Sequence, residues 1–188
     1  MNLVVAALIL TAVGVGCGGA PDEPRLLVPQ AVPDEVTSEL DVVWSDFRRV
    51  FAGRLGCVPD VTILLVDDVV GGDARYVVAD ARIEVRIPTT PARFRESVAH
   101  ELAHHVEHTC PEFDELRVQL NRGFWTGTWE AGDDWWDTPS ERWAEHVVEL
   151  INGGRVRHTT EMPIDEAAIA MIRAWAAGPL RSGGGQTR

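Results

Sequence analysis

Three residues in the middle of the chain have the types and the spacing of a metal-dependent hydrolytic site. His100, Glu101 and His104 form a His-Glu-x-x-His motif within residues 97–108. In a helix the two histidines lie about 6 Å apart along the axis and about 40° apart around it, so both imidazoles can reach one ion. Glu101 falls beside His104, where its carboxylate can face a metal-bound water without being a ligand. The motif therefore predicts Zn²⁺ on His100 and His104, with Glu101 as the general base.

The residues around the motif predict a buried helix whose polar face lies on a cleft. Pro91 is a typical helix-starting residue, and the sequence Thr109-Cys110-Pro111 is a typical stop. The apolar residues between these limits recur at helical spacing and form one broad arc. They are Phe94, Val98, Ala99, Leu102, Ala103 and Val106.

Three further side chains could contact the site, and each also has a structural interpretation. His105 falls on the apolar arc, so we expect a semi-buried histidine with hydrogen-bond partners. His108 shares the metal face but lies a further turn beyond His104, too far to be expected as a ligand. Tyr76, the only tyrosine, could donate to an oxyanion if its strand borders the cleft. Otherwise it is structural.

The N-terminus has the pattern of an export signal. Residues 1–16 form an apolar, uncharged run that is too short to span a bilayer and ends in small residues. The Gly16-Cys17 junction resembles a bacterial lipoprotein processing site, at which Cys17 becomes the lipidated first residue. Simple secretion and a retained anchor are the alternatives. We therefore predict an exported protein of the bacterial cell envelope, held at the membrane through Cys17.

Cysteine usage agrees with export. With Cys17 assigned to the signal region, Cys57 and Cys110 remain, and an even pair in an exported domain most often forms a disulfide. This bridge would tie the end of the motif helix to the segment before the first strand. Metal binding by these thiols is a poor alternative, because Cys110 lies well over a turn beyond His104.

Length and charge limit the possible domains and partners. The 188 residues suit one domain, which we expect over residues 34–180. Residues 17–33 are predicted to be a flexible tether, and residues 181–188 a disordered tail. The net charge of −12 argues against a nucleic-acid partner.

The remaining patterns predict an α+β domain with the order helix, small sheet, motif helix and further helices. β-Branched or alternating runs predict strands over Val61–Val66, Arg75–Ala79 and Arg82–Ile87. Helical spacing of apolar residues predicts further helices over Glu35–Leu55, Pro111–Arg122, Thr138–Asn152 and Pro163–Ala177.

Residues 123–138 have no clear period and are predicted to form a long loop. They include the aromatic residues Phe124, Trp125, Trp129, Trp135 and Trp136. A long loop of this kind is often a lid or a wall of a substrate cleft. A tryptophan-rich loop can equally be an aromatic plug that completes a small core, and both interpretations stay open.

A third metal ligand must come from outside the motif, because a catalytic zinc usually has three protein ligands. One zincin pattern has a His six residues after the second motif histidine and a Gly between them, but Cys110 and Glu107 stand at these positions and exclude it. In the other common pattern the ligand is a Glu on a following helix, with an acidic residue four positions later. Glu141 and Glu145 have this spacing. On these residues and the motif, the chain resembles the Glu-zincin class of zinc metallopeptidases over about residues 60–152.

The resemblance implies a zincin-like α+β fold, in which a small antiparallel sheet packs on a metal-binding helix and a Glu-bearing helix. It implies one Zn²⁺ per chain, bound by His100, His104 and Glu141. It also implies that Glu101 is catalytic, that Glu145 supports a ligand histidine, and that the substrate is a peptide or protein.

Several alternatives to this assignment stay open. Glu145 could be the ligand with Glu141 as its support, while Glu130 and His146 are less favoured candidates. The same zinc could serve an amidase acting on cell-wall material. An alternative of another class is an envelope binding or scaffold lipoprotein with a structural or vestigial metal site. Glu101 speaks against it, because a purely structural site has no need of a base at that position. For a peptidase, the strand at 82–87 is predicted to pair with an extended substrate.

Overall fold

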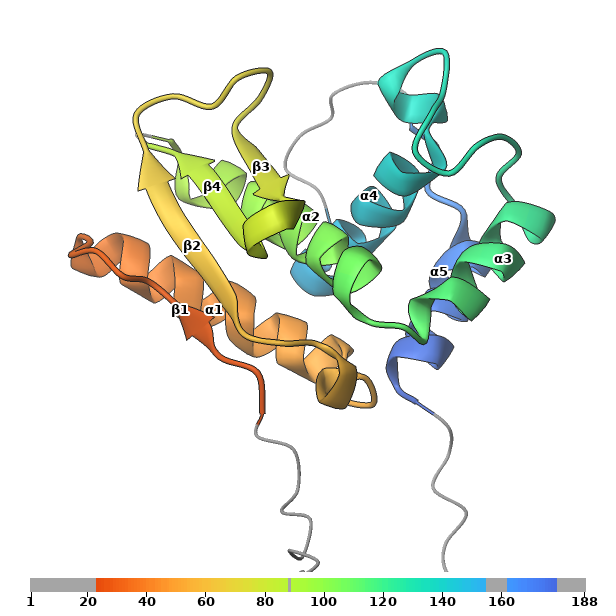
Figure 1. The fold of residues 1–188 in the computed structure, drawn as a ribbon, viewed down its shortest axis with the longest axis horizontal. Helices are drawn as coiled ribbons and strands as arrows, with labels where there is room; N and C mark the ends of the chain where they lie inside the picture. The colour runs from red at the N-terminus through yellow and green to blue at the C-terminus, as the bar shows by residue number, and fades with distance from the viewer. Residues whose placement is uncertain (1–22, 88, 155–161, 179–188) are drawn as a thin grey trace, which may run out of the picture.

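The helix that carries the motif runs through the middle of the fold, with the sheet on one side and the Glu-bearing helix on the other (Figure 1). The computed structural model describes residues 23–87, 89–154 and 162–178. The motif helix, α2, spans Pro91–Thr109, as predicted. All six residues of its predicted apolar arc are buried.

The other elements follow the predicted order, with one additional strand at the start. The strands are β1 (Leu26–Leu27), β2 (Val61–Val66), β3 (Ala74–Val77) and β4 (Arg82–Arg86). The remaining helices are α1 (Asp34–Val50), α3 (Phe113–Gly123), α4 (Pro139–Asn152) and α5 (Glu166–Ala176). The α+β class is therefore confirmed.

The sheet is mixed, so the prediction of an antiparallel sheet is wrong. Its strand order is β1-β2-β4-β3. β1 and β4 both pair parallel to β2, and only β3 and β4 are antiparallel. The reason is that β3 does not pair with β2, the strand before it in sequence. The chain crosses to the far edge of the sheet to form β3, and then turns back through a short 3₁₀ turn at Val78–Asp80 to insert β4 between them.

This topology also corrects the strand predicted to receive a substrate. β4 (Arg82–Arg86) has β2 on one side and β3 on the other, so both of its edges are already hydrogen-bonded. An added strand needs a free edge. Among the described residues, β3 is the edge strand of the sheet that lies next to α2.

The first strand lies within residues 17–33, the range predicted as a flexible tether. Leu26 pairs with Val61, and the Arg25 side chain donates to Asp60. The Gln30 side-chain amide donates to a β2 carbonyl at 3.0 Å. These contacts hold residues 25–30 on the sheet, so the folded domain begins before residue 34, and the predicted boundary is corrected.

Several predictions concern other parts of the chain. The signal peptide (1–16), the lipidated Cys17 and the tail (181–188) all lie outside the described residues. Within the described ranges, no helix is both long and apolar enough to cross a membrane.

α2 and α4 pack closely through small side chains and one buried tryptophan. Ala99 and Ala103 of α2 and Ala144 of α4 are fully buried. Trp143 of α4 is also fully buried, and its indole N–H donates to the Ala103 carbonyl at 3.0 Å. Because small residues let helix axes approach, the polar faces of the two helices meet at one place.

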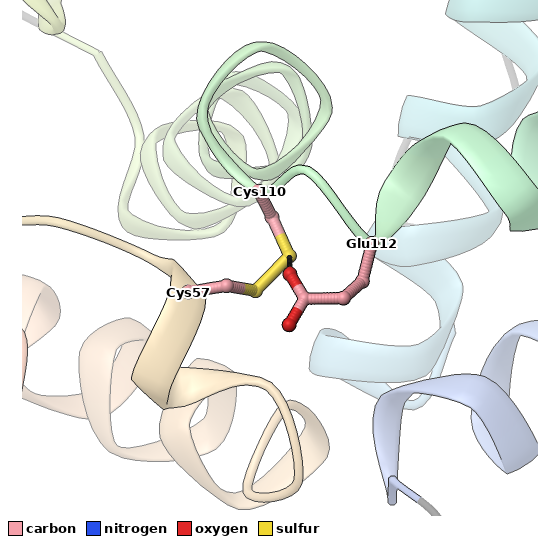
Figure 2. A group of neighbouring side chains, drawn as sticks. All are labelled: Cys57, Cys110 and Glu112. Atoms are coloured by element: carbon pink, nitrogen blue, oxygen red, sulfur yellow. Dashed lines mark hydrogen bonds between the residues drawn. A yellow bond between two sulfur atoms is a disulfide. The ribbon is translucent and has the colours of Figure 1, made fainter.

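Cys57 and Cys110 form the predicted disulfide (Figure 2). Their Cα atoms are 4.9 Å apart, and the bridge joins the C-terminal end of α2 to the segment before β2. The Glu112 carboxylate lies beside the sulfur atoms (Figure 2). Disulfide sulfurs are not thiolates, so this group of side chains is not a metal site.

We expect the double variant C57S/C110S to be less stable than the oxidised wild type by about 4 kcal/mol, because the bridge closes a long loop in the unfolded chain. The measurement is the free energy of unfolding in urea with a chelator present. The reduced wild type is the control and should match the variant. Equal stability of the oxidised wild type and the variant would contradict this expectation.

Candidate metal centre

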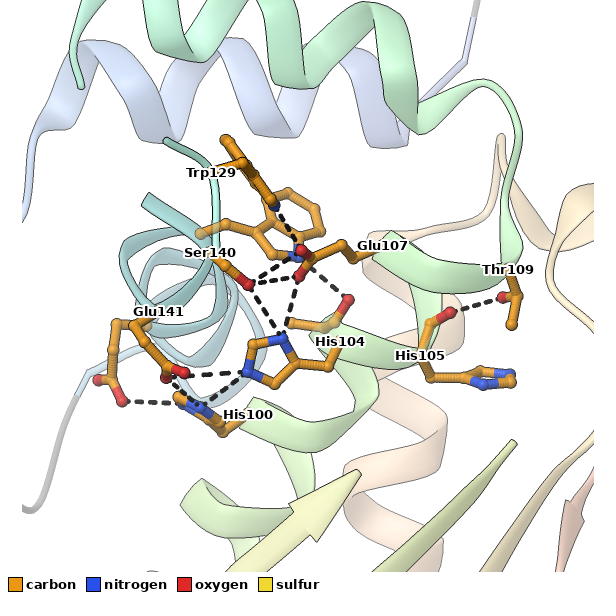
Figure 3. A network of polar contacts seen from close by, with 11 residues as sticks. His100, His104, His105, Glu107, Thr109, Trp129, Ser140 and Glu141 are labelled. Carbon is orange, nitrogen blue, oxygen red and sulfur yellow. Dashed lines mark hydrogen bonds and ion pairs between the residues drawn. The ribbon is translucent and has the colours of Figure 1, made fainter. Parts of the chain in front are cut away.

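Two helices supply the polar groups of the site. α2 carries His100 and His104 one turn apart, and α4 carries Glu141 and Glu145 one turn apart (Figure 3 shows the cluster). Both helices start from favourable residues. Pro91 stands in the first turn of α2 after the Thr90 cap, and Pro139 stands in the first turn of α4. Glu141 lies in the first turn of α4, and its carboxylate reaches His100 and His104 in the middle of α2.

Three potential ligand atoms converge on one point. The Nε2 atoms of His100 and His104 are 3.2 Å apart, and Glu141 Oε2 lies 3.0 Å from the first and 3.8 Å from the second. Two nitrogens bound tetrahedrally to one zinc ion, at about 2.0–2.1 Å each, lie about 3.3 Å apart. Glu141 Oε2 is also buried without a hydrogen bond of normal geometry. The spacing and this buried oxygen fit a metal ligand set.

Glu145 contacts the other nitrogen of His100. Its Oε1 lies 2.9 Å from His100 Nδ1. A carboxylate only accepts hydrogen bonds, so Nδ1 carries a proton, and Nε2 is the nitrogen that can offer a lone pair to a metal on the side of Glu141. The geometry therefore favours Glu141 as the ligand and Glu145 as the residue that orients His100, rather than the reverse.

The sequence reasoning missed Glu107 and Ser140. Glu107 Oε2 lies 3.0 Å from His104 Nδ1, and Ser140 Oγ lies 2.9 Å from both Glu107 oxygens. Trp129 donates its indole N–H to the same carboxylate. The spacing could have indicated Glu107, because residues three apart on a helix share a face. In the sequence analysis Glu107 served only to exclude another ligand pattern.

Glu101 is buried beside the ligand atoms but is not one of the three converging groups. Burial raises the pKa of its carboxyl above the ordinary value. The two motif histidines and a backbone hydrogen bond from Tyr76 oppose this rise in pKa without cancelling it. A buried carboxyl with a raised pKa at the edge of a ligand cluster suits a proton acceptor.

Charge pairing sets the protonation of the other groups. Burial favours a neutral His104, but the carboxylates of Glu107 and Glu141 outweigh it and raise the pKa of His104 to about 9. Burial likewise acts against ionised Glu141, and the two histidines reverse this effect and lower its pKa. The pKa of Glu107 is also lowered, because hydrogen bonds led by that of His104 outweigh the effect of burial.

His105 has the structural role that the sequence predicted. It is fully buried, and its Nε2 lies 3.1 Å from the Pro59 carbonyl, which can only accept. Its Nδ1 therefore accepts the Tyr76 hydroxyl hydrogen at 3.0 Å. Burial raises the pKa of Tyr76 to about 12. Tyr76 borders the cleft, which was the condition for an oxyanion role, but its hydroxyl proton is engaged by His105, so the structure gives no support for that role.

Two remaining candidates are placed apart from the ligand cluster. His146 is fully buried, where its Nδ1 donates to the Arg142 carbonyl at 2.7 Å and its Nε2 accepts from the Asp165 N–H at 3.0 Å. Both ring nitrogens are therefore occupied. His108 is exposed on the cleft and stacks on the Tyr76 ring, with centroids 5.7 Å apart.

The site opens into a cleft of about 700 Å³ between β3, α2, α4 and the loop before α4. The tryptophans of residues 123–138 divide between the core and the cleft. Trp125 and Trp129 are buried in the core, whereas Trp135 and Trp136 line the cleft and are 48% and 42% exposed. Trp135 also stacks on His100, with ring centroids 6.0 Å apart. Glu130, on the same loop, lines the cleft but lies outside the converging group of ligand atoms.

Comparisons of the chain with known protein families, with curated proteins and with solved structures find no match. A function must therefore be inferred from the chemistry and geometry of this cluster.

We expect zinc binding at this site to tighten as the pH rises from 7 to 9. The metal needs a neutral imidazole, and His104, with its pKa at about 9, holds a proton below that pH. One displaced proton predicts about a tenfold gain in affinity per pH unit, levelling off near pH 9. The measurement is a chelator competition titration across this range. An affinity that does not change between pH 7 and pH 9 would contradict the expectation.

Proposed function

We propose that this protein is a zinc metallopeptidase that hydrolyses peptide bonds with a metal-activated water and Glu101 as the general base. One observation carries the proposal. Two histidine nitrogens and one glutamate oxygen converge in an open cleft, and a fourth group, the buried Glu101 carboxyl, lies beside them without joining them.

The donor set supports a catalytic rather than a structural metal. Structural zinc is usually enclosed by four protein ligands that include cysteine, whereas two histidines and a carboxylate leave one position for water. Both cysteines in the described residues are joined in the disulfide, away from this cluster. When bound, zinc would polarise the scissile carbonyl and lower the pKa of a water molecule toward about 7.

The chain's own residues would perform the proton transfers. Glu101, with its raised pKa, would accept the proton of the attacking water and return it to the leaving amine. Glu145 and Glu107 would hold the two histidine rings with their Nε2 lone pairs facing the metal. The contacts that hold these two rings are already present in the protein.

The peptide substrate would lie against β3. This strand is at the edge of the sheet, and Ala74, Arg75 and Tyr76 line the cleft. An extended peptide could add to this edge through main-chain hydrogen bonds to groups other than the Tyr76 N–H, which donates to Glu101. β3 thus takes the role that the sequence analysis gave to the strand at 82–87.

We further infer that the protein is exported to the bacterial cell envelope and held there through Cys17, as the N-terminal pattern predicts. The disulfide supports export, because such bridges persist in oxidising compartments and are rare in the cytosol.

The test combines metal content and peptide hydrolysis in four proteins. We expect the wild type to hold about one zinc per chain after dialysis, E141A to lose it, and E101Q to keep it. E101Q should hydrolyse a mixture of fluorogenic peptides at least about 100-fold more slowly than the wild type, because general base catalysis contributes about 10²–10⁴ in rate. E149A, on the same helix as Glu141 but outside the cleft lining, is the control and should match the wild type.

The other outcomes separate the alternatives. A folded wild type without zinc would overturn the proposal. Zinc without peptide turnover, but with release of amines from cell-wall material, would indicate an amidase. If the wild type binds zinc but hydrolyses neither peptides nor cell-wall material, a binding or scaffold protein would be favoured.

A further inference from the structure

We propose that Glu107 is a positioning residue that orients His104 for metal binding and fastens this histidine to the tryptophan-rich residues 123–138. The inference rests on the proposed metal site and adds to it a residue outside the ligand pattern that the resemblance supplies. It concerns the second motif histidine, whereas Glu145 contacts the first.

Glu107 is a buried carboxylate whose hydrogen-bond donors all come from the site. Its side chain is only 4% exposed. It accepts from His104 Nδ1 at 3.0 Å, from Ser140 Oγ at 2.9 Å and from the Trp129 indole N–H, as Figure 3 shows. A charge in such a place is tolerated only when it is paired and hydrogen-bonded. These three donors satisfy that condition, and one of them is a metal-binding ring.

The contact fixes both the proton and the angle of the His104 ring. A carboxylate only accepts, so Nδ1 must carry the hydrogen in the metal-binding form and Nε2 must keep its lone pair. The same hydrogen bond keeps the imidazole ring from rotating about its Cβ–Cγ bond. Glu145 does this for His100 from α4, and Glu107 does it for His104 from within α2.

Glu107 also connects the metal site to the wall of the cleft. Trp129 is held in place by its own carbonyl, which accepts from the Ser140 N–H at 2.9 Å. The same loop continues to Trp135, which stacks on His100. The loop therefore contacts one motif histidine directly and the other through Glu107, so a displaced Glu107 would disturb the ligand and the wall together.

The chemistry of the site requires a carboxylate at this position. The two oxygens of Glu107 can accept from all three donors. His104 and Trp129 donate to different oxygens of Glu107, whereas a glutamine has one acceptor oxygen, so its NH₂ group would face one of these two N–H donors. The substitution E107Q would therefore leave at least one donor without a partner and remove the negative charge that makes the histidine a better metal ligand.

The test measures zinc affinity and ligand geometry in E107Q. We expect its zinc dissociation constant to rise about 10- to 100-fold, the range typical for loss of a group that supports a metal-bound histidine. We also expect the visible absorption bands of the Co²⁺-substituted protein to shift. S140A removes one donor with little change in volume, and we expect a smaller change in the same direction. E115Q makes the same charge change at an exposed position and is the matched control.

The readouts separate positioning from a purely structural role. Stability of the metal-free proteins is measured in parallel by urea unfolding. If E107Q and S140A are destabilised but bind zinc with wild-type affinity and give a wild-type Co²⁺ spectrum, Glu107 is structural and the inference is overturned, while the peptidase proposal stands. If E107Q does not fold, S140A decides by the same two readouts. If the wild type binds no zinc, both this inference and the proposed function are overturned. If the wild type binds zinc but hydrolyses no peptide, only the proposed function is overturned.

Discussion

The close packing of α2 against α4 is the constraint on which the site depends. Both motif histidines are on α2, and Glu141, whose carboxylate converges with them, is on α4. Their atoms lie 3.0–3.8 Å apart where α2 and α4 are in contact, with buried alanines on both helices and the Trp143 indole bonded across to the Ala103 carbonyl. The same interface is part of the hydrophobic core, so the stability of the domain and the geometry of the site are coupled.

This packing also concentrates negative charge in a poorly hydrated place. Glu101, Glu107, Glu141 and Glu145 surround two imidazoles, and three of these four carboxylates contact a histidine nitrogen. A proton on His104 offsets part of this charge, which is why its pKa is raised to about 9. A divalent cation at the point where Glu141 and the Nε2 atoms converge would offset more of it. The charges of the cluster thus favour a cation at the same point on which the potential ligand atoms converge.

The features that could be predicted from the sequence are those that depend on a local pattern. The period of α2, the spacing of its histidines and the Cys57–Cys110 pair were all predicted without the structure, because each depends on one short segment or on a count of residues. The direction of the sheet strands was predicted wrongly, because nothing in the segment at 74–77 indicates which neighbour it pairs with. The short strand at Leu26 was missed for the same reason, since its contacts are with residues more than thirty positions away.

Within the site, the limit of sequence reasoning was again the distance between partners. Glu107 was visible as a residue one turn after His104, but its role depends on Trp129 and Ser140, which reach it only through the packing of the loop and of α4. The loop gave no period because its tryptophans divide between two environments. Trp129 is buried where it can bind Glu107, and Trp135 turns outward over His100. A segment that must join the core to the cleft in this way cannot have one repeating face, and its lack of pattern follows from the two tasks that it performs.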